Sequence, residues 1–137
     1  MNYQKLISQA KRHEGKRLDL HKCPAGYWSI GYGHNLEAKG VSQAIADQLL
    51  LDDLAEAETA VRKHISIEHL NDALIAVLIN MAFNLGMAGL LKFKLFLYYL
   101  SMGDYERAAD EMLDSRWAMQ VGGRAKELAE QMRTGEW

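Results

Sequence analysis

The sequence has a single cysteine, Cys23, and a single proline, Pro24, which lies beside it. One cysteine cannot form a disulfide within the chain. Cys23 is also not part of a Cys/His cluster at the spacing that zinc sites use. We therefore expect no metal and no cofactor.

The chain also lacks a strong net charge, since its formal charge is −2, and nothing global points to a nucleic acid partner. Its N-terminus is polar, without the apolar core of a signal peptide. The uncharged run over residues 73–91 is interrupted by polar residues and glycines, so a buried helix explains it better than a membrane span. We expect no stable membrane insertion and a monomer.

A length of 137 residues fits one domain. Apolar residues recur at helical spacing over Tyr3–His13, and Gly15 stands where a C-terminal cap belongs. The glycine-rich segment Leu18–Leu36 predicts a small antiparallel hairpin or meander. Further helices are predicted at the following places: from Ser42 to about His64, from Asn71 or Asp72 to Gly86, over Leu90–Leu100, after Asp104, and after Gly122-Gly123. The fold class is α+β, mainly α.

The first candidate for chemistry is Glu14, at the end of the first predicted helix. The helix macrodipole disfavours negative charge at that end, so a carboxyl there keeps its proton more readily, as a general acid must. Cys23 lies nine residues later and Ser29 six after that, and a hairpin would bring them towards Glu14. The alternatives are a surface glutamate paired with a lysine, a buried small cysteine and an exposed strand serine.

The predicted hairpin contains two histidines, His21 and His34. A cysteine protease would pair Cys23 with His21 or His34, but no third residue is evident to orient the histidine. His34 is predicted to be structural, held by a hydrogen bond, with Asp53 or Glu56 as candidate partners. The basic residues of positions 1–22 could meet an anionic polymer or form a solvated helix face.

The run from Glu14 through Cys23 to Ser29 and His34 resembles the catalytic segment of phage-type lysozymes, the endolysin muramidases of glycoside hydrolase family 24. That family has a Glu, eight residues, an Asp or Cys, five residues and a Thr. The segment from Asn80 to Gly86 resembles the family's central helix. Further matches are Ser115-Arg116-Trp117, Gly123-Arg124-Ala125 and the run from Arg133 to Trp137, so the resemblance spans nearly the whole chain.

The resemblance implies a lysozyme-like domain over residues 1–137. It has a small N-terminal lobe (about 14–60), a helical lobe (about 65–137) joined to it by the helix at 3–13, and a cleft between the lobes. It implies peptidoglycan as the partner and cleavage between N-acetylmuramic acid and N-acetylglucosamine. Such an enzyme is made in the bacterial cytoplasm from a phage or prophage gene and reaches the periplasmic wall after release.

The resemblance also implies residue roles. Glu14 is the general acid, and Cys23 and Ser29 stand where the family has its water-orienting Asp and Thr. Asn84, Arg124 and Tyr32 contact substrate, and Arg124 approaches Glu14. Cysteine in place of aspartate removes a negative charge, and serine keeps the threonine hydroxyl without its methyl group. A lytic transglycosylase and a catalytically weak wall-binding relative are the alternative functions.

Overall fold

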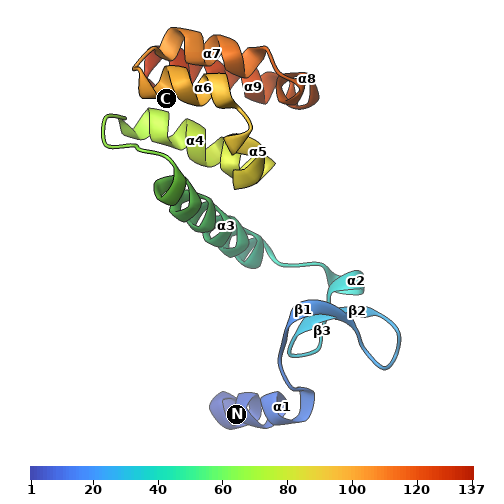
Figure 1. Cartoon of the computed structure of the whole chain (residues 1–137). Helices are drawn as coiled ribbons and strands as arrows, with labels where there is room; N and C mark the ends of the chain where they lie inside the picture. Colours follow the sequence, from blue (N-terminus) through green and yellow to red (C-terminus); the bar gives the residue numbers. More distant parts are fainter. The chain divides into compact units, whose positions relative to one another are not determined.

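The computed structural model describes residues 1–137 and confirms the mainly α, α+β fold. The strands are β1 (Arg17–Lys22), β2 (Trp28–Gly31) and β3 (His34–Asn35). The helices are α1 (Tyr3–Glu14), α2 (Leu36–Lys39), α3 (Gln43–His64), α4 (Asp72–Leu85), α5 (Met87–Leu91), α6 (Lys94–Ser101), α7 (Tyr105–Leu113), α8 (Arg116–Val121) and α9 (Gly123–Thr134) (Figure 1). None of these helices combines the length and the apolar character that a membrane-spanning segment requires.

The chain groups into two compact units, Met1–Gln48 and Leu49–Trp137, and α3 contains the boundary between them. The first unit holds α1, α2 and a three-stranded antiparallel sheet in the order β1-β2-β3. This sheet is the meander that the glycine pattern predicts. Ser29 lies on the central strand, opposite His21 of β1 and Asn35 of β3, so its backbone is in the middle of the sheet.

Helix α1 confirms the first predicted helix and extends it by one residue to include Glu14. The Asn2 side chain caps its start by accepting a hydrogen bond from the Lys5 amide. Gly15 ends it at φ +69°, and the Gly15 amide donates to the Lys11 carbonyl at 3.0 Å. The glycine turns the chain at once into β1, so Glu14 is the last helical residue before the sheet.

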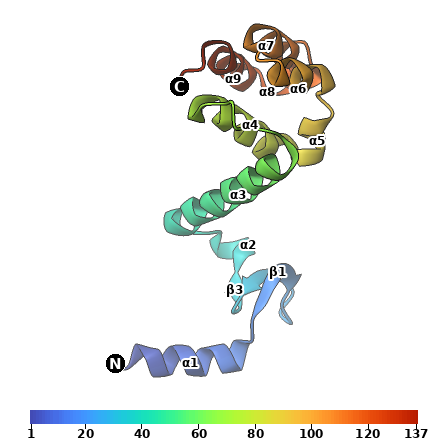
Figure 2. The ribbon, with the colours of Figure 1, turned by 60° about the vertical axis from the view of Figure 1, so that its left-hand side comes forward.

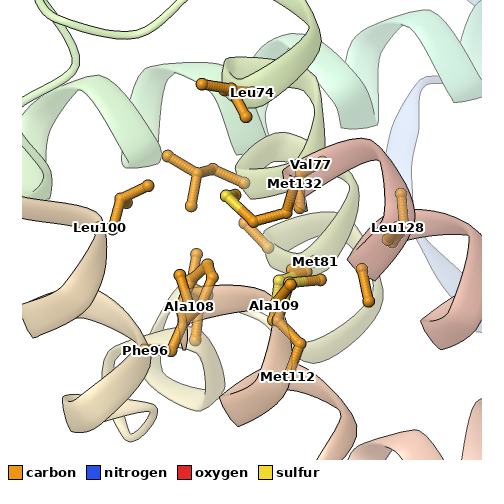
Figure 3. Packing of buried hydrophobic residues seen from close by; sticks show 14 of the residues in the cluster. Leu74, Val77, Met81, Phe96, Leu100, Ala108, Ala109, Met112, Leu128 and Met132 are labelled. Atoms are coloured by element: carbon orange, nitrogen blue, oxygen red, sulfur yellow. The ribbon is translucent and has the colours of Figure 1, made fainter. Parts of the chain in front are cut away.

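The second unit has its core between α4, α6, α7 and α9 (Figure 3). Helix α7 packs against both α6 and α9, and α4 packs against α9, as Figures 1 and 2 also show. The largest fully buried side chains here include Phe96, Leu78, Met81 and Met112. Asn71 and Asp104 cap α4 and α7 as predicted, and Gly86 ends α4. This apolar core explains the uncharged run of α4.

One predicted helix is wrong. The segment Leu90–Leu100 is divided between α5 and α6, with Lys92 and Phe93 between them. The Phe93 ring packs edge-to-face on Phe96 and on Trp117, at centroid distances of 6.3 and 6.1 Å. These tertiary contacts compete with local helix propensity. The short helices α2 and α8 were not predicted.

The long helix α3 confirms the predicted element, and Ser42 caps it by accepting from the Ile45 amide at 3.3 Å. Its apolar side chains differ in burial. Ala57 and Val61 are buried, whereas Ile45 and Leu49 are about half exposed. Ala57 and Val61 belong to the core of the second unit.

Candidate active site

The end of α1 and the sheet form a pocket of about 580 Å³ in the first unit. Its lining includes all three residues singled out for catalysis, Glu14, Cys23 and Ser29. They come from the end of a helix, the turn after β1 and the central strand. The hairpin thus brings together a carboxyl, a thiol and a hydroxyl that are separated by up to 15 positions in the sequence.

Ser29 is the one fully buried polar residue of the chain. Its hydroxyl has no hydrogen-bond partner among the protein atoms. Leaving a buried hydroxyl without a partner costs about 1–3 kcal/mol, which is why such groups are rare unless they serve a purpose. Ser29 is also one of the residues that line the pocket, so this unpartnered hydroxyl belongs to the pocket wall.

Cys23 is half-buried at the start of the turn between β1 and β2. The turn is closed by the Cys23 amide donating to the Tyr27 carbonyl at 2.9 Å, and by the Gly26 amide donating to the Cys23 carbonyl at 2.8 Å. Burial by itself raises the pKa of the Cys23 thiol. Hydrogen bonds from Tyr27, and from the backbone of Ala25 and Gly26, outweigh it, so the net pKa is lowered.

Tyr27 completes this arrangement, and sequence reasoning missed it. Its hydrogen bond to Cys23 raises the pKa of the Tyr27 hydroxyl while it favours the thiolate of Cys23. Tyr27 also lines the pocket. The available signal in the sequence was the position of Tyr27. It lies four residues after Cys23, across a turn that contains Pro24 and Gly26.

The pocket is also lined by four basic side chains, Lys16, Arg17, His21 and Lys22. Arg17 is paired with Asp19 at 3.1 Å, and this hydrogen bond lowers the pKa of the Asp19 carboxyl. The basic residues predicted to form either a binding face or a solvated face thus lie partly on the pocket. A thiol in such surroundings is favoured as thiolate.

His34 is held by a hydrogen bond, as predicted, and the partner that the structure gives is the Gly40 carbonyl, 2.6 Å from Nε2. His21 Nδ1 lies 3.1 Å from the Asp19 carbonyl. The pairing of Cys23 with a histidine that a cysteine protease needs has no support in these contacts.

The residues predicted to bind substrate have other partners. Tyr32 is not part of the pocket lining, and the Lys11 ammonium lies 5.2 Å from its ring centroid. In the second unit, Asn84 Oδ1 accepts from Trp117 Nε1 at 2.7 Å. Arg124 donates twice to Asn80 Oδ1, at 2.9 and 2.6 Å, and lies 6.0 Å from the Phe83 ring. The approach of Arg124 to Glu14 stays a prediction.

Comparison with known proteins gives a consistent result. The phage lysozyme family matches residues 11–134. The chain is 33% identical to the endolysin of Acyrthosiphon pisum secondary endosymbiont phage 1, over 79% of this chain and 73% of that protein. It is 32% identical to the endolysin of Bacillus phage B103, over 78% of this chain and 42% of that protein. It is 24% identical to a probable T4-type lysozyme of Dictyostelium discoideum, over 91% of each chain.

The family match contains Glu14, Cys23 and Ser29, the whole sheet and the helices that form the core of the second unit. The resemblance first seen in short motifs therefore extends over both units. On this evidence the chain belongs to the phage lysozyme family.

Proposed function

We propose that this protein is a peptidoglycan hydrolase that cleaves the β-1,4 bond between N-acetylmuramic acid and N-acetylglucosamine. The observation that carries the proposal is the pocket that joins Glu14, Cys23 and Ser29. Membership of the phage lysozyme family and the name endolysin carried by two relatives support it.

In this mechanism the Glu14 carboxyl donates its proton to the glycosidic oxygen as the bond to the anomeric carbon breaks. The sugar then leaves as a neutral alcohol instead of an alkoxide. A positioned general acid of this kind contributes about 10²–10⁴ to the rate. Breaking the bond leaves positive charge on the sugar ring, as an oxocarbenium-like centre.

Ser29 and Cys23 serve the second half of the reaction. The Ser29 hydroxyl, which lacks a protein partner, orients a water molecule towards the anomeric carbon. The Cys23 thiolate accepts a hydrogen bond from the same water, stabilises the positive ring, and takes the water proton as the water oxygen bonds to the anomeric carbon. The hydrogen bonds that lower the pKa of Cys23 favour that role and offset the charge lost with the family's aspartate.

The proposal for substrate contacts rests on the resemblance alone. Asn84, Arg124 and Tyr32 contact the glycan, and Arg124 approaches Glu14. The proposed partner is bacterial peptidoglycan, met by a monomer that binds no nucleic acid. We further propose synthesis in the bacterial cytoplasm from a phage or prophage gene and action on the periplasmic wall after release.

Digestion of purified peptidoglycan tests the reaction. We expect soluble muropeptides whose muramic acid ends are reducing, as mass spectrometry will show. Anhydro-muramic acid ends, lighter by one water, would instead identify a lytic transglycosylase. Binding to the walls without release of soluble fragments would contradict any hydrolytic activity.

Replacing Ser29 with alanine is expected to lower the rate of peptidoglycan cleavage about tenfold, because one of two groups that orient the water is lost. The free energy of unfolding should not fall, since the buried hydroxyl has no partner to lose. Lysis assays and urea denaturation measure the two quantities. Ser29→Thr, which keeps the hydroxyl, is the matched control. A large loss of stability in Ser29→Ala would contradict the assignment.

A further inference from the structure

Gly33 lies directly beside the Glu14 carboxyl. A Cβ atom built on Gly33 would be 2.8 Å from Glu14 Oε2, 3.4 Å from Cδ and 3.8 Å from Cγ. A carbon and an oxygen that are not bonded do not approach to 2.8 Å without strain. The carboxyl group of Glu14 therefore occupies the space that a side chain at position 33 would take.

The sheet holds the turn that carries Gly33. Gly33 follows Tyr32 between β2 and β3, and its position is held by the antiparallel pairs on either side, Ile30 with His34 and Ser29 with Asn35. Glu14 is the last residue of α1, so the helix sets the position of its backbone, while its exposed side chain can still rotate. The backbone of the turn at Gly33 therefore lies against the Glu14 carboxyl.

Gly33 has φ +76°, which by itself favours glycine, so the residue type alone does not reveal the contact. Two other glycines separate the effect of a positive φ from the effect of the contact with Glu14. Gly31 has φ +70° and Gly103 has φ +72°, and a Cβ atom on either would have nothing within 4 Å. Gly31 and Gly103 share the positive φ of Gly33, but neither has a side chain where its Cβ atom would lie.

We propose that Gly33 is a positioning residue for Glu14: its missing side chain lets the carboxyl rest against the turn, in the place from which it reaches the glycosidic oxygen. This inference rests on the proposed function, in which Glu14 is the general acid. Catalytic groups must be held within about 0.5 Å of their productive geometry, and a misplacement of about 1 Å can cost 10²-fold in rate. A methyl group at position 33 displaces the carboxyl by tenths of an ångström or turns it away.

The first test is kinetic. Gly33→Ala is expected to lower kcat for peptidoglycan cleavage about tenfold with KM unchanged, because the proton donor is displaced and the sugar contacts remain. Gly103→Ala, in the second unit, is the control with matched φ and should keep its kcat. A loss of kcat in Gly33→Ala no larger than that in Gly103→Ala would overturn the proposal.

The second test measures the contact without activity, in a double-mutant cycle. Gly33→Ala should lower the melting temperature less in a Glu14→Ala background than in the natural chain, because truncation removes the colliding carboxyl. Gly31→Ala should lower it equally in both backgrounds. If Gly33→Ala alone does not fold, recovery of the fold in the double variant supports the contact, and failure to recover it counts against the contact.

The two tests separate this inference from the proposed function. Equal melting temperature losses for Gly33→Ala in both backgrounds would reject the contact while leaving hydrolysis untouched. A clear coupling in a protein that releases no muropeptides would confirm the contact and reject the function.

Discussion

Replacing Glu14 with glutamine is expected to reduce the rate of peptidoglycan cleavage about a thousandfold. Glutamine has nearly the shape of glutamic acid but cannot donate a proton to the glycosidic oxygen. Positioned general acids contribute about 10²–10⁴ to such rates, and Glu14 is the only carboxyl that lines the pocket. The measurement is the initial rate at which soluble fragments appear from purified walls.

The control removes a carboxyl from the same unit without touching the pocket. Glu37 lies in the first turn of α2 and does not line the pocket, so Glu37→Gln should keep full activity. Both variants should unfold within about 0.5 kcal/mol of the natural chain, as substitutions at exposed positions usually do. Full lytic activity in Glu14→Gln would end the assignment of Glu14 as the acid.

Alkylation of Cys23 with iodoacetamide is expected to reduce cleavage about a hundredfold. The thiolate displaces iodide and forms a thioether, which places an amide group in the pocket beside Glu14 and Ser29. That group occupies the place of the water and displaces the substrate, and small misplacements at a reacting centre are costly. Since Cys23 is the only cysteine, a single mass addition by mass spectrometry reports complete modification.

The pH dependence of this reaction tests the lowered pKa of Cys23. An ordinary thiol is half ionised near pH 8.5, so Cys23 should reach half its maximal alkylation rate at a lower pH. Tyr27→Phe removes a hydrogen bond that favours the thiolate and should move that midpoint upward. A midpoint at or above that of a small free thiol would contradict the argument. Treatment of Cys23→Ser should leave its activity as it was before treatment.

Elements whose signals are local could be predicted from the sequence. Helix α4 begins at the Asn71 cap and ends at Gly86, and both residues act within one turn of the backbone that they cap. The division between α5 and α6 could not be predicted, because no glycine or proline marks it. It depends on the packing of Phe93 against Trp117, a residue 24 positions away, which only the folded chain brings near.

The sequence contains a capping residue for the short helix α8, although this helix was not predicted. Ser115 caps it, accepting a hydrogen bond from the Ala118 amide at 3.1 Å. A serine before a helix of six residues is weak evidence by itself, because serines are as common in turns. Packing of the buried Trp117 supplies what the local sequence does not.

The candidate site also has parts that depend on local sequence and parts that depend on the folded structure. Glu14, Cys23 and Ser29 lie within 16 consecutive residues, so the helix end and the hairpin suffice to bring them together. The hydrogen bond of Tyr27 to Cys23 and the contact of Gly33 with Glu14 depend on where a tight turn points its backbone. Neither is encoded in periodicity or composition.

The buried hydroxyl of Ser29 has a consequence for directed evolution of this protein. Replacing it with an apolar residue removes an unsatisfied group from the sheet, so libraries ranked by heat resistance alone would enrich changes at position 29. The variants that such a screen retains would lack the hydroxyl that is proposed to orient the water. Selection for a more robust lytic enzyme should therefore score cleavage first and thermal survival second.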